Sequence, residues 1–334
     1  MRSRAVVFTG PGVVEVGDVE CPEPGAEDVV IALRHSWIST GSESSFLRGE
    51  RIAGDTPRGE GDPLPFPMVA GYQKVGTVVS VGERVLGLEP GDTVFATRGR
   101  VEGMTELFPY GGHVSPAVVP RAAVWRLPDH VDPLAFSGLV LTQVGYNCGA
   151  RPPVAVGDPA VVLGDGLVGH WAAQTLAWRG AEVVLVGRHP DRLARFEPGP
   201  PHATIDSRVV EPHEWLAKRF PDGLAVVVDT VGSIAAVEAM VPAMRRFGHI
   251  VSAGFYGNDD RLALQPLRER EITVDVVSGI DKGRMDIALQ LIAAGHLQTL
   301  PLITHHFPVD HAAQAWQLIV DRAEPFLGVV LDWQ

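Results

Sequence analysis

The sequence predicts an α/β protein of two domains, a β-rich first domain followed by a domain with a doubly wound parallel sheet. Three observations predict this fold class. The chain has 334 residues, enough for two domains of ordinary size. Short strand-like runs separated by Gly and Pro fill its first third. From about residue 140 onward, strand-like runs alternate with helix-like ones.

The β-rich part consists of short runs of β-branched and aromatic residues, each with the length of a strand in a barrel-like unit. The expected strands are residues 5–8, 29–33, 75–81 and 93–96. Residues 49–67 are crowded with Gly, Pro and charge, so we expect a long surface loop there.

In the second half, apolar strands alternate with segments of helical length. The expected strands are residues 161–163, 182–186, 224–229, 249–253 and 272–277. The expected helices are residues 167–179, 234–246, 285–294 and 312–320. Alternation of this kind is typical of βαβ crossovers and a parallel sheet.

The first strand of this half runs into a G-x-G-x-x-G turn formed by Gly164, Gly166 and Gly169. The first glycine allows the tight turn, the second lets the backbone approach a pyrophosphate, and the third lets the helix pack on the strand. Leu167 and Val168 open that helix, whose N-terminus favours phosphate charge. We therefore expect a Rossmann dinucleotide-binding domain. A glycine-rich turn in another α/β domain is the alternative.

The residues after the next strand bear on the choice of dinucleotide. Gly187 and Arg188 stand where an NAD-dependent enzyme usually carries Asp or Glu, and Arg192 follows. A guanidinium binds phosphate bidentately, so the pattern favours NADP(H) as cofactor. The alternative is that both arginines are solvated surface residues and cofactor selectivity is loose.

Composition favours a cytoplasmic enzyme with a small-molecule substrate. The net charge of −12 argues against nucleic acid and against an anionic membrane surface. Cys21 and Cys148, the two cysteines, provide neither a disulfide framework nor a four-thiolate zinc lobe. The apolar run at residues 5–8 is too short for a secretion signal, and no segment has the roughly 20 apolar residues of a membrane span.

Several short motifs occur along the chain in a characteristic order. They are Gly71 with Gly76, residues 90–94, the glycine turn, Asp229 with Gly232, and residues 328–331. Together they resemble the medium-chain dehydrogenase/reductase superfamily, the alcohol dehydrogenase-like enzymes, over nearly the whole chain.

This resemblance implies a GroES-like catalytic domain at residues 1–141 and 281–334 and a Rossmann NADP-binding domain at residues 142–280. It also implies a homodimer, formed through the edge strand at residues 272–277. The residues that it places beside the nicotinamide are Gly254, Ser278 and Gly279, and Gly232 is a further residue expected to bind the cofactor.

The chain departs from the zinc-containing members at their ligand positions. Thr40 stands at the cysteine position, or Ser39 if the register slips by one. Tyr72 stands at the histidine position, and Val140 at the third. A catalytic zinc needs three N, S or O ligands and one open position, so we expect no zinc.

Without a metal, a hydrogen-bond donor must stabilise the oxyanion that develops during hydride transfer. Tyr72 is our first candidate for this acid, and Ser42 matches the proton-relay hydroxyl of the family. Thr40 and Glu43 are further candidates. The alternatives are that Tyr72 only lines an apolar pocket and that Ser42 caps a helix or turn.

Residues 37–43 with Gly71 and Tyr72 are also similar to the bacteriochlorophyllide dehydrogenase branch, which oxidises a hydroxyethyl group on a tetrapyrrole and lacks the zinc set. This similarity favours hydride transfer to or from a secondary alcohol or ketone of a fairly apolar substrate. The residues expected to contact that substrate are Trp37, Ser39, Phe46 and Tyr72. Alternatives are reduction of a C=C bond, as in enoyl and quinone reductases, and a nucleotide-bound protein without turnover.

Overall fold

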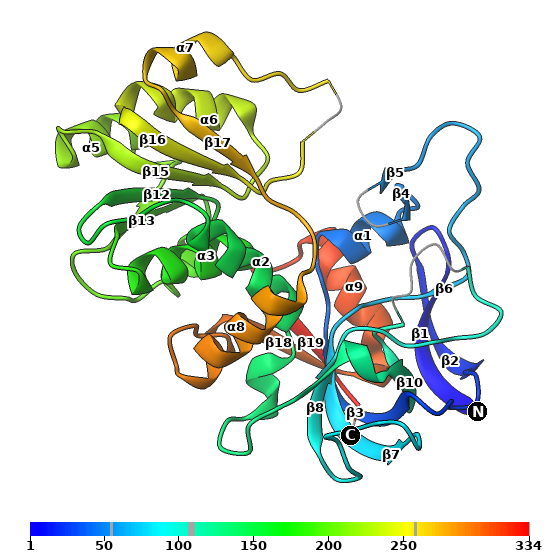
Figure 1. Ribbon diagram of the computed structural model, residues 1–334. Helices are drawn as coiled ribbons and strands as arrows, with labels where there is room; N and C mark the ends of the chain where they lie inside the picture. Colours follow the sequence, from blue (N-terminus) through cyan, green and yellow to red (C-terminus); the bar gives the residue numbers. More distant parts are fainter. Residues whose placement is uncertain (54–55, 106–110, 257–258, 334) are drawn as a thin grey trace. The chain divides into compact units, whose positions relative to one another are not determined.

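The computed structural model of the protein describes residues 1–53, 56–105, 111–256 and 259–333. The chain divides into two compact units (Figure 1). Unit 1 comprises Met1–Val140 and Ile303–Gln334, and unit 2 comprises Leu141–Leu302. Among the described residues, no helix is both long enough and apolar enough to cross a bilayer.

Unit 1 contains two sheets and a short hairpin. In the first sheet, β1 (Arg2–Gly10) pairs with β2 (Val13–Glu20), β6 (Met68–Val69) and β9 (Val114–Ser115). The second sheet has the order β11 (Val124–Arg126), β8 (Thr93–Ala96), β7 (Lys74–Val81), β3 (Asp28–Trp37), β19 (Gly328–Asp332), β18 (Ile303–Pro308). A further strand of this sheet, β10 (Ala117–Pro120), pairs with β3. The hairpin of β4 (Arg51–Ala53) and β5 (Thr56–Pro57) lies in the segment expected to be a loop.

The strand β1 lies between two apolar cores of unit 1. Ala5 and Val7 belong to the core between the sheets, whereas Val6 and Phe8 belong to the core that includes α1 (Ser42–Leu47) and α9 (Ala312–Asp321). This alternation follows from the period of two along a strand. The described part of unit 1 also contains the 3₁₀ turns η1 (Arg121–Ala123), η2 (Pro133–Phe136) and η5 (Val309–His311).

Unit 2 is built on a six-stranded parallel sheet (Figure 1). Its order is β14 (Ala203–Asp206), β13 (Glu182–Gly187), β12 (Pro159–Leu163), β15 (Leu224–Asp229), β16 (Met244–Ser252), β17 (Thr273–Val276). Counted along the chain, this is the order 3-2-1-4-5-6 of a Rossmann sheet, so the predicted fold class is confirmed. Its helices are α2 (Leu139–Ala150), α3 (Leu167–Trp178), α4 (Pro190–Leu193), α5 (Pro212–Arg219), α6 (Ile234–Met240), α7 (Leu264–Glu269) and α8 (Lys282–Ala293), with η3 (Val241–Ala243) and η4 (Leu300–Leu302).

Both faces of this sheet are covered by helices. Ala160 and Val162 of β12 pack with α2 and α3, whereas Val161 and Leu163 pack with α5, α6 and α7. A strand that is buried on both faces has no polar face, which explains its continuous apolar sequence. The carboxyl ends of β12 and β15 meet where the strand order reverses, the place where such sheets bind ligands.

The structure changes two boundaries in unit 2. The expected helix 234–246 ends at Met240, and η3 and the start of β16 at Met244 follow. Pro242, which has no N–H for the helical ladder, lies in η3. Residues 281–302, assigned from the sequence to the first domain, group with unit 2. There Gln298 O accepts hydrogen bonds from Trp171 Nε1 and Gln174 Nε2 of α3.

Candidate functional site

The glycine turn between β12 and α3 has the geometry of a phosphate cradle. Gly164 has φ +115°, and a Cβ on it would lie 2.4 Å from Thr230 Oγ1. A Cβ on Gly169 would lie 1.9 Å from Gly164 O. By contrast, a Cβ on Gly166 would meet nothing within 4 Å. Gly164 and Gly169 are therefore required by the fold itself, whereas Gly166 leaves open space before the first turn of α3, where helical N–H groups are free to bind an anion.

A carboxylate lies at the end of β13, where the sequence analysis finds none. It belongs to Asp165 of the glycine turn, whose Oδ2 accepts hydrogen bonds from Arg188 N (2.7 Å) and His189 N (2.8 Å). A Cβ on Gly187 would lie 2.3 Å from the same oxygen, so glycine at this position admits the carboxylate. Burial raises the pKa of Asp165, but the hydrogen bonds from His189 and Arg188 outweigh it, and the net pKa lies below its usual value.

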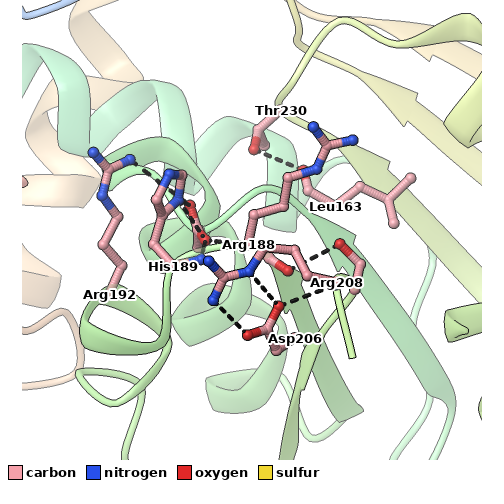
Figure 2. A network of polar contacts seen from close by, with 10 residues as sticks. Leu163, Arg188, His189, Arg192, Asp206, Arg208 and Thr230 are labelled. Carbon is pink, nitrogen blue, oxygen red and sulfur yellow. Dashed lines mark hydrogen bonds and ion pairs between the residues drawn. The ribbon is translucent and has the colours of Figure 1, made fainter. Parts of the chain in front are cut away.

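Three arginines gather around this strand end (Figure 2). Arg188 is exposed, and Arg192 Nη1 lies 3.8 Å from Asp165 Oδ1. Arg208, which follows β14, binds Asp206 through Nε (3.0 Å) and Nη2 (2.7 Å). These hydrogen bonds lower the pKa of Asp206 to about 2. The sequence analysis missed Arg208, because only the pairing of Gly187 with Asp206 brings β14 beside β13.

The carboxyl end of β15 is held by a buried carboxylate. Asp229, with no exposed surface, accepts hydrogen bonds from Val231 N (2.9 Å), Gly232 N (3.1 Å) and Ser233 N (3.1 Å). Tyr256 donates its hydroxyl to Asp229 Oδ2 (2.6 Å). Burial, and then this hydrogen bond, raise the pKa of Tyr256 above its ordinary value. The loops after β15 and β16 are thereby tied together.

Four residues predicted to bind the cofactor lie on the loops after β15, β16 and β17. They are Gly232, Gly254, Ser278 and Gly279. Gly232 has φ +85°, and a Cβ on Gly254 would lie 2.0 Å from Gly232 N, so these two loops touch backbone to backbone. Ser278 and Gly279 are exposed after β17, and Gly279 O accepts a hydrogen bond from Gln143 Nε2 (3.0 Å). The structure thus gathers these glycines at one edge of the sheet, the edge that also carries the glycine turn.

In unit 1, the segment with the predicted catalytic hydroxyls forms a turn into α1. Thr40 and Ser42 are partly exposed. Ser42 is the first residue of α1, and Gly41 occupies the N-cap without a side-chain cap, so Ser42 does not cap this helix. Ser39 and Glu43 bind each other twice, from Glu43 N to Ser39 O (2.9 Å) and from Ser39 N to Glu43 Oε1 (2.8 Å).

The remaining oxygen of Glu43 binds a histidine that the sequence analysis missed. Glu43 Oε2 lies 2.9 Å from His113 Nε2, and His113 Nδ1 lies 2.7 Å from Ser36 Oγ. Glu43 is 2% exposed, and His113 and Ser36 have no exposed surface. Tyr72 follows Gly71, whose Cβ, if it had one, would lie 2.5 Å from the His113 ring. No sequence motif marks His113, since its partner is 70 residues away.

The two aromatic residues predicted to contact substrate lie in the interior of unit 1. Trp37 has no exposed surface, and a Cβ on Gly138 would lie 2.9 Å from its ring. Phe46 is 2% exposed and packs in the core with α9. Neither side chain offers surface to a ligand in this structure, so their contact with substrate stays a prediction.

The residues at the zinc-ligand positions supply neither thiolate nor imidazole. Thr40 and Tyr72 carry neutral hydroxyls, and Val140 is apolar and 2% exposed. In the part of the chain that the structure describes, no group of three or more His, Cys, Asp and Glu side chains is arranged to hold a metal ion. This donor set does not fit a catalytic zinc.

A buried lysine lies two residues after Tyr72. Lys74 has no exposed surface, and its Nζ donates a hydrogen bond to Gly111 O at 2.6 Å. Burial lowers the pKa of Lys74 to about 7. No sequence signal indicates that this lysine is buried, because a lysine at the start of a strand is ordinarily solvated.

Both units match known protein families. Residues 27–129 match the alcohol dehydrogenase GroES-like domain, which confirms the expected class of the first domain. Residues 168–294 match the zinc-binding dehydrogenase family. These two matches cover the strands of unit 1 from β3 to β11 and most of unit 2.

Similar proteins extend the match to the full chain. The 2-desacetyl-2-hydroxyethyl bacteriochlorophyllide A dehydrogenase of Cereibacter sphaeroides is 25% identical, with 100% of this chain and 99% of that protein covered. The sorbitol dehydrogenase of Rattus norvegicus is 26% identical, with 95% and 92% covered. The crystal structure of a putative zinc-binding dehydrogenase from Sinorhizobium meliloti, bound to NADP, has a TM-score of 0.86 at 20% identity and covers 100% of both chains.

Proposed function

Since the chain belongs to the medium-chain dehydrogenase/reductase superfamily of oxidoreductases, we propose that it transfers hydride between NADP(H) and a secondary alcohol or ketone without a catalytic zinc. One observation carries the proposal. The same chain has a phosphate cradle and an arginine cluster in unit 2 and, in unit 1, a hydroxyl-bearing turn that offers no zinc ligands. The substrate would be small and fairly apolar.

The residues of unit 2 fit the phosphates of NADP(H). Gly164, Gly166 and Gly169, with the first-turn amides of Leu167 and Val168, would hold the pyrophosphate, because only Gly166 borders open space. The guanidinium groups of Arg188 and Arg192 would bind the 2′-phosphate, with Gly187 leaving room beside them.

One carboxylate near this subsite needs an explanation, since Asp165 would repel a phosphate. Its oxygens already accept two backbone N–H groups and lie 3.0 Å from His189 Nδ1, and Arg192 lies within ion-pair distance. The charge of Asp165 is therefore used in holding the turn that presents Arg188. The Sinorhizobium meliloti structure, which contains NADP, supports this choice of cofactor.

NADPH supplies the hydride when it is bound, and the chain must supply the proton. Tyr72, our proposed acid, would donate its phenolic proton to the oxygen of the substrate, because a phenol carries an O–H group that can protonate a developing alkoxide. The partly exposed hydroxyls of Ser42 and Thr40 would pass protons to that oxygen. Gly232, Gly254, Ser278 and Gly279 would border the nicotinamide; this set lies at the carboxyl edge of the sheet.

The chemical class of the substrate is proposed from the relatives. The Cereibacter sphaeroides relative is named for a hydroxyethyl group on a bacteriochlorophyllide, and the rat relative for sorbitol. The segment at residues 37–43 is similar to the former, so we propose an apolar carbon skeleton that carries a secondary alcohol or ketone.

A deuteride-transfer experiment tests the proposal. The protein is incubated with 4-deuterated NADPH and a panel of aryl ketones, enones and quinones, with and without a chelator. Deuterium on a carbinol carbon, at a rate that the chelator does not change, is the expected result. Deuterium on the carbon β to a carbonyl would instead establish reduction of a C=C bond. Tight NADPH binding without any turnover would favour a non-catalytic protein, and a chelator-sensitive rate would contradict the metal-free mechanism.

We also propose a homodimer formed through β17. This strand is the last in the sheet order of unit 2, and Val276 on it is 75% exposed. An apolar, uncovered edge strand tends to pair with another strand. Light scattering on the purified protein should give twice the mass of one chain, and a monomeric mass would contradict the proposal.

A further inference from the structure

We propose that His113 is a positioning residue that joins the two segments carrying the catalytic hydroxyls. It reaches the first of them through Glu43, which positions that segment and does not act on the substrate. This inference rests on the proposed function, because it assigns a role within the same catalytic site. It concerns unit 1 alone.

The first link runs from His113 to the turn that bears Thr40 and Ser42. An ionised carboxylate only accepts hydrogen bonds, so the 2.9 Å contact has His113 Nε2 donating to Glu43 Oε2. The other oxygen, Glu43 Oε1, accepts from Ser39 N at 2.8 Å. Glu43 thus fixes the backbone directly before Thr40, and His113 fixes Glu43.

The second link runs from His113 to Tyr72. The ring of His113 lies against Gly71, where any side chain would clash at 2.5 Å, and Gly71 has φ +83°. The backbone adds two contacts, because His113 N donates to Ala70 O (2.9 Å) and Gly112 N donates to Gly71 O (2.8 Å). The backbone that leads into Tyr72 is therefore packed against the same histidine.

A third contact holds the ring itself. His113 Nδ1 lies 2.7 Å from Ser36 Oγ, which also accepts a hydrogen bond from Trp333 Nε1 at 2.8 Å. The ring also stacks edge to face on Trp316, with centroids 5.4 Å apart. Both ring nitrogens are thus engaged and the ring packs against Trp316 and Gly71, so the orientation of His113 is fixed by its surroundings.

The hydrogen bonds of this pair assign it to the structure of unit 1 rather than to proton transfer to substrate. His113 has no exposed surface and Glu43 is 2% exposed, and both Glu43 oxygens are occupied by donors of the chain. A buried charge with all its partners satisfied rigidifies its surroundings, whereas removal of one partner leaves an unpaired group. The network therefore serves the geometry of the hydroxyls of Thr40, Ser42 and Tyr72.

Two substitutions of similar size separate the links. In His113→Gln, the side-chain amide reaches as far as Nε2 and can still donate to Glu43. In His113→Asn, the shorter amide reaches only the Nδ1 position and loses Glu43. His130→Gln, at an exposed histidine of the same unit, is the control. Hydrogen exchange followed by mass spectrometry on peptides covering residues 36–47 and 68–75 needs no substrate.

We expect His113→Asn to speed exchange in both peptides by about tenfold or more, and His113→Gln and the control to leave it near wild type. With NADPH and acetophenone as probe, kcat should fall about tenfold in His113→Asn and recover in His113→Gln, with KM for NADPH unchanged. Glu43→Gln should lower kcat by the same factor at every pH, so that the shape of the pH profile does not change.

Three results would overturn the inference. One is unchanged exchange in His113→Asn, and another is equal exchange in the Asn and Gln variants. The third is the loss of one limb of the pH profile of kcat/KM in Glu43→Gln, since that limb would report a reacting carboxylate. Wild-type protein that binds NADPH but reduces no ketone would count against the proposed function alone, because the exchange experiment still decides the role of His113.

Discussion

Replacement of Lys74 by Met should make the protein more stable at low pH and less stable at high pH. Lys74 has no exposed surface, and its Nζ has Gly111 O as a hydrogen-bond acceptor at 2.6 Å. An ammonium group in such a place loses its hydration, and the carbonyl of Gly111, its hydrogen-bond partner among the described residues, replaces little of it. Methionine fills a similar volume and carries no charge.

The direction of the pH dependence follows from the pKa of Lys74, which burial lowers from 10.5 to about 7 in the folded state. Between about pH 7 and pH 10.5, the unfolded chain binds this proton and the folded chain does not, so the free energy of unfolding rises with pH through this window. Below about pH 7 both states are protonated, and the full cost of burying the charge is present.

The magnitude follows from the size of this shift. A lowering from 10.5 to about 7, at 1.36 kcal/mol for each pKa unit, gives a cost of about 5 kcal/mol as an upper bound. Loss of the hydrogen bond to Gly111 O costs the variant about 1 kcal/mol. Lys74→Met should therefore be more stable than wild type by up to about 4 kcal/mol near pH 6. This difference should fall to about zero near pH 10, where the unfolded chain still holds most of the proton, and only above about pH 11 should the variant be the less stable protein, by about 1 kcal/mol.

Urea unfolding followed by circular dichroism at several pH values between 6 and 10 measures this difference. Contributions of other groups cancel when the variant is compared with wild type at each pH. Lys218→Met, at an exposed lysine of α5, is the control and should give a small difference that does not change with pH. A Lys74→Met difference that is constant across the range would refute the reasoning.

Three further predictions concern the proposed site. Arg188→Ala should weaken NADPH binding about tenfold to a hundredfold and leave NADH binding unchanged, as measured by fluorescence titration. Equal losses of affinity for both cofactors would contradict a contact of Arg188 with the 2′-phosphate. Tyr72→Phe should lower kcat by about 10²-fold at constant KM for NADPH, and near-normal turnover would remove Tyr72 as the acid. Gly166→Ala should fold normally but bind NADPH poorly, because its Cβ enters the open space proposed for the pyrophosphate. Gly169→Ala should instead unfold at a lower temperature, because its Cβ would lie 1.9 Å from Gly164 O. Thermal melts and NADPH titrations of the two variants measure this difference.

Much of unit 2 could be predicted from the sequence. The apolar run of β12 and the spacing of Gly164, Gly166 and Gly169 are local signals, since they depend on the chain's own backbone geometry. The expected helix 234–246 was too long, since Pro242 lies in the 3₁₀ turn that follows α6. The expected helix 285–294 began too late, since Asp281 caps α8 by accepting a hydrogen bond from Arg284 N and the helix begins at Lys282.

In the candidate sites, the sequence predicted the arginines that follow β13 but not their neighbours. Asp165 was part of the glycine turn in the sequence, and only the structure brings its carboxylate to the end of β13. Arg208 comes beside this strand end through the register of β14 with β13. Residues that meet across strands carry no short-range pattern, so spacing along the chain cannot reveal them.

The sequence by itself determined the α/β class and the glycine turn that joins β12 to α3, because each depends on residue types within a few positions of one another. Only the tertiary structure decided which buried groups are partners. It paired Glu43 with His113 across 70 residues and enclosed Lys74 in the β-rich unit. The physical reason is that burial and hydrogen-bond partners are set by strand pairing and loop packing, which are long-range in the chain.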